Sequence, residues 1–139
     1  MLELVTSLTT CVIGLYAGSL LTEGVILVPY WRRMTPEDFF SKHSEMGPSL
    51  FKYFAPLTTL AVGLSILTAI LEGGRHTIAA GLCILALIIF FLYFKKANAS
   101  FTDHSLENEH LKKELEKWSA WHWLRTIIII SALFVSVSA

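Results

Sequence analysis

The sequence predicts an all-α integral membrane protein: a four-helix bundle with a short amphipathic helix after the first span and a long fourth helix extended into the cytoplasm. Hydrophobic residues make up 54% of the 139 residues, a high fraction for a soluble chain. Four apolar runs are long enough to cross a bilayer and fill most of the sequence. They cover residues 4–31, 53–71, 77–94 and 121–139. A chain of this length is expected to form one transmembrane domain, residues 1–139.

The distribution of charge predicts the partners and the orientation. The formal net charge is zero, so the composition favours no nucleic acid, and the expected partners are the lipid bilayer and a lipophilic small molecule. A homo-oligomer is compatible with this composition. Lysine and arginine gather in the two long loops, whereas the turn between the second and third spans carries only Arg75. The positive-inside rule therefore predicts cytoplasmic long loops and both termini on the non-cytoplasmic side.

The first span combines small residues with one acidic side chain. Gly14 and Gly18 are four residues apart, a spacing that lets a neighbouring helix approach closely. Glu23 lies nine residues before Arg32, which places it about 13 Å inside the membrane boundary. A charge at that depth is costly unless it has a partner. Glu23 is therefore expected to pair with a basic residue from another span.

The segment after the first span predicts a short helix of its own. Thr35-Pro36-Glu37-Asp38 supplies an N-cap threonine, a proline at the first helical position and acids at the positive end of the helix dipole. The helix is expected to stop at Gly47-Pro48 and the second span to follow from about Tyr53. One side of the short helix is apolar, so it is expected to lie on the membrane surface or to cap the bundle. His43 on this helix is either a surface residue or folded over the mouth of the bundle.

The fourth helix is expected to run from about Ser105 to the C-terminus. At 3.6 residues per turn, Trp118, His122 and Arg125 fall on one face, and Trp121 lies close to it. Arg125 lies seven residues beyond Trp118, about 10 Å into the membrane. Antiparallel packing then brings Arg125 to the depth of Glu23. His122 is expected one turn shallower.

Two interpretations of this cluster stay open. In the first, Glu23 and Arg125 form a buried ion pair that fixes helix packing, with His122 as a hydrogen-bond partner. In the second, which we favour, they line a polar pocket open to the cytoplasmic side, because intramembrane charges and aromatic walls are typical of functional sites. The aromatic residues expected to line this pocket and hold a bound molecule are Trp118, Trp121 and Tyr30, with Asn98 near the rim.

A metal ion is a second possibility for this site. Glu23, His43 and His122 form a two-histidine, one-carboxylate set of the kind that binds non-haem iron, and copper is also compatible with histidine ligands. The spans contain no HxxxH or ExxH pair, so the spacing does not strengthen the case. The expected cofactor is accordingly either none or a transition metal, iron or copper.

The order of polar residues resembles a known family. Asn98 follows the third span, and Trp118-x-x-Trp121-His122-x-x-Arg125 leads into the fourth, which is similar to the anthrone oxygenase-like family of small four-helix membrane proteins. This resemblance implies an oxygenase or oxidase acting on an aromatic, hydroquinone-like substrate. It also implies site roles for Asn98, His122 and Arg125, whereas Glu23 and His43 come from the argument on depth and residue type.

The functional hypotheses belong to different classes. In a cofactor-free oxidation His122 is the general base, and Arg125 and Asn98 stabilise the developing oxyanion before reaction with dioxygen. In a metal-dependent version Glu23, His122 and His43 are the ligands. The alternative is a non-enzymatic binding or scaffold subunit in which Glu23 and Arg125 form a structural pair. Transport with Glu23 as a proton carrier is a weaker alternative.

Overall fold

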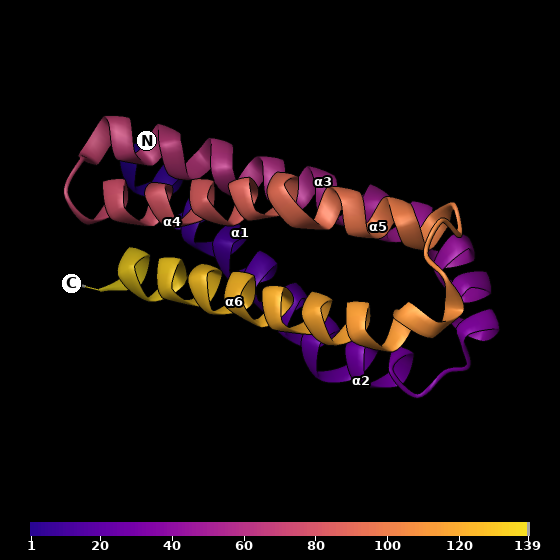
Figure 1. Ribbon diagram of the computed structural model, residues 1–139. Helices are drawn as coiled ribbons and strands as arrows, with labels where there is room; N and C mark the ends of the chain where they lie inside the picture. Colours follow the sequence, from indigo (N-terminus) through magenta and orange to yellow (C-terminus); the bar gives the residue numbers. More distant parts are fainter. Residues whose placement is uncertain (139) are drawn as a thin grey trace.

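The computed structural model describes residues 1–138, and all regular elements in this part of the chain are helical (Figure 1). Four continuous helices are long and apolar enough to cross a membrane: Leu2–Trp31, Pro36–Glu72, Arg75–Thr102 and Asn108–Val137. The predicted all-helical architecture with four membrane-length helices is therefore confirmed. In chain order the elements are α1 (Leu2–Thr22), π-turn η1 (Glu23–Leu27), α2 (Val28–Trp31), α3 (Pro36–Glu72), α4 (Arg75–Ile89), π-turn η2 (Phe90–Phe94), α5 (Lys95–Thr102), 3₁₀-turn η3 (Asn108–His110) and α6 (Leu111–Val137).

The first helix contains a π-turn at its acidic residue. In η1 the backbone N–H of Val28 bonds to the carbonyl of Glu23, five residues earlier. Pro29 follows directly, and a proline inside a helix lacks an N–H and crowds the preceding turn, so a wider turn accommodates it. The π-turn therefore sets the direction in which the Glu23 side chain projects from the first helix.

The predicted separate amphipathic helix is wrong, because α3 is continuous from Pro36 to Glu72. Its start is as expected: the Thr35 hydroxyl oxygen accepts a hydrogen bond from the Asp38 N–H at 3.2 Å. The helix then passes through Gly47 and Pro48 without ending. A proline inside a helix bends it when packing holds both flanks. Figure 1 shows the start of α3 crossing the end of the bundle before the helix turns to run along it.

Side chains from the start of α3 pack on the end of α5 and hold this bent segment in place. The rings of Phe39 and Phe101 meet edge to face with centroids 5.2 Å apart. The Ser44 hydroxyl donates to the Thr102 carbonyl at 3.3 Å. These contacts with α5 keep α3 helical through Gly47-Pro48, and the local sequence around these two residues does not reveal them.

The fourth long helix begins later than expected. The η3 turn precedes it, and α6 starts at Leu111 and not near Ser105, after a left-handed residue at His104, whose φ is 54°. Leu111 and Leu115 are buried, so the first turns of α6 pack against the bundle. The charged stretch before Trp118 is therefore part of the packed structure.

The interior consists of two clusters. The aromatic one brings α2, the start of α3, the end of α4, η2, α5 and the start of α6 together at one end of the bundle. Its buried members are Val28, Trp31, Phe39, Phe40, Ile89, Phe94, Ala97, Phe101, Leu111, Leu115 and Trp118. The second, aliphatic cluster lies along α1, α3, α4 and α6. Its buried members are Val12, Ile13, Tyr16, Ala17, Leu20, Ala61, Val62, Cys83, Ala86, Ile129 and Ala132.

Candidate functional site

Three ionisable side chains meet inside the bundle. Glu23 Oε2 lies 3.6 Å from His122 Nδ1 and 3.8 Å from Arg125 Nη2. Only 5%, 0% and 7% of Glu23, His122 and Arg125 are exposed. The structure thus brings Glu23 and Arg125 together, as their predicted depths require. The cluster joins the first long helix to the fourth.

The two ring nitrogens of His122 have different partners. Nε2 lies 2.8 Å from the Leu20 carbonyl oxygen, and Nδ1 lies 3.3 Å from Arg125 Nη2. A carbonyl only accepts and a guanidinium only donates, so Nε2 carries the hydrogen and Nδ1 accepts. His122 is therefore a neutral imidazole whose lone pair points at Arg125 and Glu23.

Gly24 allows α6 to approach the π-turn this closely. A Cβ added at Gly24 would lie 3.1 Å from His122 Nε2 and 3.2 Å from Trp123 Cζ2. His122 has little freedom to move away, because the Leu20 carbonyl holds one edge of its ring and Trp118 stacks on its face. The close contact therefore depends on the absence of a side chain at residue 24.

We expect Gly24→Ala to lower the free energy of unfolding by about 1–3 kcal/mol, the typical cost of overpacking. Gly18→Ala is the matched control on the same helix, since a Cβ there meets nothing within 4 Å, and alanine is favoured over glycine inside a helix. Thermal unfolding in detergent measures both. Equal stability of the two variants would contradict a tight contact between Gly24 and His122.

Trp118 links His122 to the aromatic cluster. Its ring stacks on the His122 ring with centroids 5.1 Å apart and planes at 7°, and its Nε1 donates to Asn98 Oδ1 at 2.9 Å. Trp31 and Phe94 pack edge to face on the same indole. Asn98 therefore acts on His122 through Trp118. The role of Asn98 in stabilising an oxyanion stays a prediction, because that role would use the amide N–H groups and the Trp118 contact uses the amide oxygen.

Arg125 is held by an aromatic face as well as by charge. Its Cζ lies 4.2 Å from the centroid of the Phe94 ring, a cation–π contact. Within the described residues, Arg125 Nε and Glu23 Oε2 are buried without a hydrogen-bond partner. Buried polar atoms are nearly always hydrogen-bonded. The Glu23–Arg125 pair is therefore close enough to attract electrostatically but leaves hydrogen-bonding capacity unused.

Two of the predicted aromatic residues lie outside this cluster. Tyr30 is 56% exposed and points away from the interior. Trp121 is half-buried and stacks on Tyr93 with centroids 5.5 Å apart. Sequence periodicity placed Trp121 near the His122 face, and Tyr30 of the first span was expected to line the pocket, but the side of α6 that carries Trp121 packs on η2. Only Trp118, of the three predicted aromatic residues, contacts His122.

His43 is buried, yet it lies apart from Glu23 and His122. Its ring packs among Trp31, Phe39 and Phe101, and its Nδ1 lies 3.4 Å from Thr102 Oγ1. Two indole rings, Trp31 and Trp118, stand in sequence between the His43 ring and the His122 ring. Of the two alternatives left open for His43, a surface position does not fit its burial, but His43 does not join the charged cluster either.

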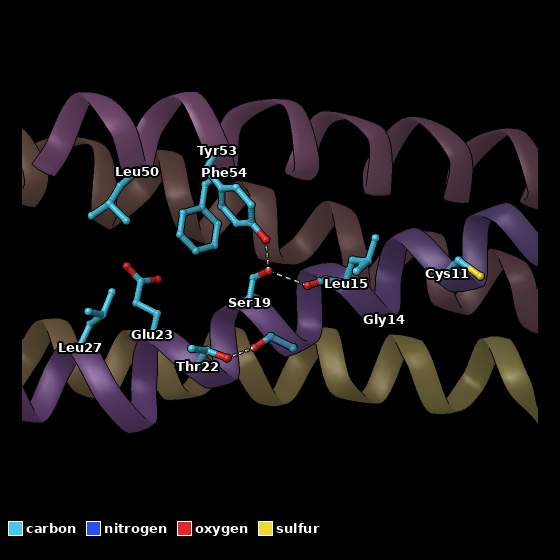
Figure 2. A pocket seen from close by; sticks show the side chains of 11 residues that line it. Cys11, Gly14, Leu15, Ser19, Thr22, Glu23, Leu27, Leu50, Tyr53 and Phe54 are labelled. Atoms are coloured by element: carbon cyan, nitrogen blue, oxygen red, sulfur yellow. Dashed lines mark hydrogen bonds between the residues drawn. The ribbon is translucent and has the colours of Figure 1, made fainter.

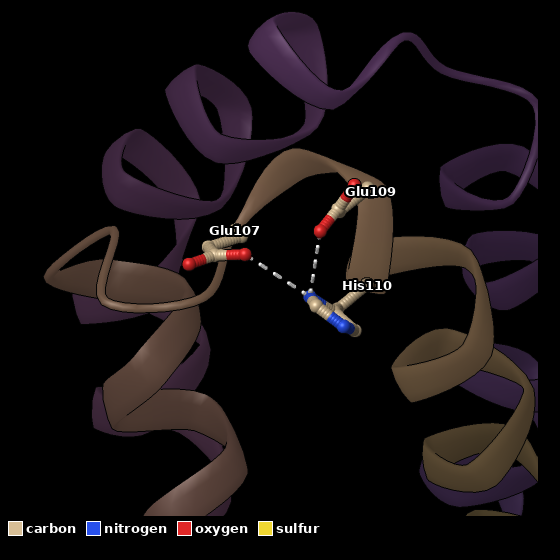
Figure 3. A group of neighbouring side chains, drawn as sticks. All are labelled: Glu107, Glu109 and His110. Atoms are coloured by element: carbon tan, nitrogen blue, oxygen red, sulfur yellow. Dashed lines mark ion pairs between the residues drawn. The ribbon is translucent and has the colours of Figure 1, made fainter.

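The predicted iron or copper set of Glu23, His43 and His122 does not fit this arrangement. His43 is remote, and both nitrogens of His122 already face protein groups, one of them a guanidinium. Among residues 1–138, the one group of three potential ligands with atoms within 4.8 Å of one another is Glu107, Glu109 and His110 (Figure 3). These side chains are exposed at the start of the fourth helix and form ordinary surface ion pairs.

A groove between α1 and α3 was not predicted. Its volume is about 900 Å³, and Glu23 lies between Ser19 and Leu27 toward one end of it (Figure 2). The lining residues are Cys11, Gly14, Leu15, Gly18, Ser19, Thr22, Glu23, Leu27, Leu50, Tyr53 and Phe54. Glu23 is thus reached from the flank of the bundle and not through an aromatic mouth at its end. The sequence predicted close helix packing at Gly14 and Gly18, but a Cβ at Gly18 would meet nothing within 4 Å, so these small residues leave space beside α1.

The arrangement offers a buried carboxylate, backed by an imidazole and a guanidinium, toward one end of an apolar groove. Such a group can accept a proton from a bound molecule while the neighbouring cation stabilises the anion that forms. No protein-family model, curated protein or solved structure matches this chain. The function is therefore argued from the geometry of this cluster and groove.

Proposed function

We propose that this chain is a multi-pass membrane protein that oxidises a lipophilic aromatic or quinol-like molecule held in the α1–α3 groove. The observation that carries the proposal is the Glu23 carboxylate, which is buried, incompletely hydrogen-bonded and near one end of a groove of about 900 Å³. That volume lies within the range of small-molecule sites. An ionisable residue kept inside a membrane bundle at such cost points to function.

Glu23 is the better general base of the two candidates. It lines the groove, whereas His122 is fully buried and both of its ring nitrogens face protein groups. The sequence favoured His122 as the base, and the geometry supports moving this role to Glu23. His122 is then a positioning residue: its neutral Nδ1, 3.6 Å from Glu23 Oε2, can accept a hydrogen bond once the carboxyl is protonated.

The proposed reaction balances with dioxygen as the oxidant. The O–H bond of a quinol breaks and its proton passes to Glu23, which leaves a phenolate. Arg125 lies 3.8 Å from the Glu23 carboxylate. The negative charge passes from Glu23 to the substrate oxygen but stays close to the Arg125 guanidinium, which continues to stabilise it. Loss of two electrons and two protons in total gives the quinone and reduces dioxygen to hydrogen peroxide. An anthrone-like substrate would instead lose a proton from an activated C–H bond.

The proposal also includes an orientation. The basic residues of the two long loops support a cytoplasmic position for the aromatic end of the bundle, with both termini on the other side. The Glu23 cluster is then near the cytoplasmic end of the membrane. A substrate dissolved in the bilayer can reach the groove from the side, because several residues along its edge are exposed.

We expect the protein, purified in lipid nanodiscs, to consume oxygen and form hydrogen peroxide when a quinol is added. An oxygen electrode and a peroxide assay measure the two quantities, and empty nanodiscs report the uncatalysed oxidation. A rate no higher than that of empty nanodiscs, across alkylated quinols and anthrones, would rule out the proposed activity.

A non-enzymatic binding or scaffold subunit is the second candidate. It is favoured by the links that Leu20, Glu23, His122 and Arg125 make between the first and fourth helices, since such links also serve packing alone. This candidate predicts no oxygen uptake with any substrate. It also predicts that every variant that restores stability restores all other properties of the protein.

A further inference from the structure

We infer that the α1–α3 groove selects the reduced, hydroxyl-bearing form of an aromatic molecule with an alkyl tail, and discriminates against the oxidised quinone. This inference rests on the proposed function of the same groove and names its substrate class. The ring lies against Glu23 and Tyr53, and the tail follows α1 toward Cys11. Two features carry it: the hydrogen-bonding character of the groove and its length.

Each hydroxyl that lines the groove has already used its hydrogen. The Ser19 hydroxyl donates to the Leu15 carbonyl at 2.7 Å, and Thr22 donates to the Gly18 carbonyl at 2.8 Å. Tyr53 Oη lies 2.7 Å from Ser19 Oγ. Because a hydroxyl has one hydrogen, Tyr53 must be the donor in that contact. The hydroxyl oxygens of the groove are therefore left with acceptor lone pairs.

The acidic end of the groove has the same character. Glu23 lines the groove, and its carboxylate, whose Oε2 faces His122 and Arg125 in the interior, can only accept hydrogen bonds. The polar groups available to a ligand are thus acceptors at both Glu23 and Tyr53. A quinol presents hydroxyl donors to both. A quinone presents only carbonyl acceptors and would leave these groups unpaired.

The spacing of the two acceptor points fits one aromatic ring. Ser19 and Glu23 are four residues apart on α1, about 6 Å along the axis. Figure 2 shows both side chains directed from α1 toward α3, with Tyr53 reaching Ser19 from the opposite side. This separation is of the same order as the distance between two para hydroxyls on a benzene ring, so one hydroxyl can face Glu23 while the other faces the Ser19–Tyr53 pair. A dihydroxy aromatic can therefore bond both points at once.

The groove continues well beyond the space that one ring needs. From Glu23 to Cys11 it follows twelve residues of α1, about 18 Å. Beyond Ser19 its wall is formed by Gly14, Leu15 and Gly18, which offer no polar side-chain group. A Cβ at Gly18 would meet nothing within 4 Å, so the middle of the groove is open. An alkyl tail fits along this wall. Because such a tail dissolves in the bilayer, the molecule can enter the groove from the side.

Binding of radiolabelled decylhydroquinone to the full chain in phosphatidylcholine nanodiscs tests the inference. We expect saturable binding, at least about tenfold weaker binding of decylbenzoquinone, which has the same tail without donors, and similarly weaker binding of hydroquinone without a tail. Gly18→Leu should weaken binding of decylhydroquinone at least tenfold. Gly63→Leu and Gly81→Leu are matched controls, because a Cβ at either glycine also meets nothing within 4 Å and neither lines the groove.

Several outcomes would overturn the inference. Equal affinity for the quinol and the quinone removes the donor argument, and equal affinity for hydroquinone with and without the tail removes the length argument. Equal losses in Gly18→Leu and the two controls would show an effect unrelated to the groove. If Gly18→Leu changes only the oligomeric state, measured by mass photometry, the groove is an interface between copies. Selective quinol binding without oxygen uptake would leave this inference intact and reject the proposed oxidation.

Discussion

Glu23→Gln is expected to lower the rate of quinol oxidation by about 10²–10⁴-fold, the usual contribution of a general base. Glutamine keeps the shape of the side chain and its place near one end of the groove, but it cannot accept the substrate proton. The affinity for the quinol should fall much less, because the amide oxygen still accepts a hydrogen bond. Oxygen uptake and ligand binding in nanodiscs measure the two effects separately.

The control for this variant is Glu72→Gln. Glu72 is the last residue of α3, at the opposite end of the bundle, where it contacts Thr6 and His76. Its loss removes a carboxylate of the same helix bundle without touching the groove. Turnover by Glu72→Gln should match that of the unaltered protein. Unchanged turnover in Glu23→Gln would show that Glu23 is not the base.

Arg125→Met is expected to lower the free energy of unfolding by about 3–5 kcal/mol, the typical cost of removing one partner of a buried ion pair. Methionine keeps much of the volume over the Phe94 ring, so packing changes little. Glu23 is then left as a buried carboxylate beside the lone pair of His122, without a neighbouring cation. Unfolding in detergent, followed by circular dichroism, measures the loss.

The double variant Glu23→Gln/Arg125→Met separates structure from chemistry. It contains neither buried charge, so its stability should return to within about 1–2 kcal/mol of the unaltered protein, because neutral replacements of buried ion pairs are often tolerated. Its turnover should stay as low as that of Glu23→Gln. Recovery of turnover together with stability would reject the role of Glu23 in the reaction.

The membrane-length helices and the pairing of the charged residues were predictable from the sequence. A hydrocarbon core of fixed thickness requires about 20 apolar residues per helix, and a fixed rise per residue then gives the depth of each charge. That reasoning paired Glu23 with Arg125 and put His122 one turn away. The sequence also predicted the N-cap at Thr35, because a capping pattern depends only on residues close together in the chain.

The continuity of α3 could not be read from Gly47-Pro48. These residues normally end a helix in water, where nothing compensates for the missing hydrogen bond. Here the start of α3 is held on the end of α5 by Phe39, Ser44 and their partners, so the chain bends at the proline and remains helical. Local signals describe the intrinsic preference of a segment, whereas these contacts come from residues about 60 positions away.

Contacts between helices also decided where His43, Tyr30 and Trp121 lie. Periodicity gives the face of a helix on which a residue lies, but the neighbour that covers that face depends on how helices rotate and cross. Two indoles separate His43 from His122, and this alone removes the predicted metal set. The groove likewise exists because α1 presents small residues to a helix that does not cover them.

By itself, the sequence determined the all-helical class of the protein, the helices long enough for a membrane, and the pairing of Glu23 with Arg125, because apolar length and helical rise are properties of each segment alone. The tertiary structure decided the rest: which nitrogen of His122 carries the hydrogen, which side of the bundle opens toward Glu23, and which hydroxyls in the groove remain acceptors. Each of these depends on atoms brought together from different helices, as when the Leu20 carbonyl fixes the His122 ring.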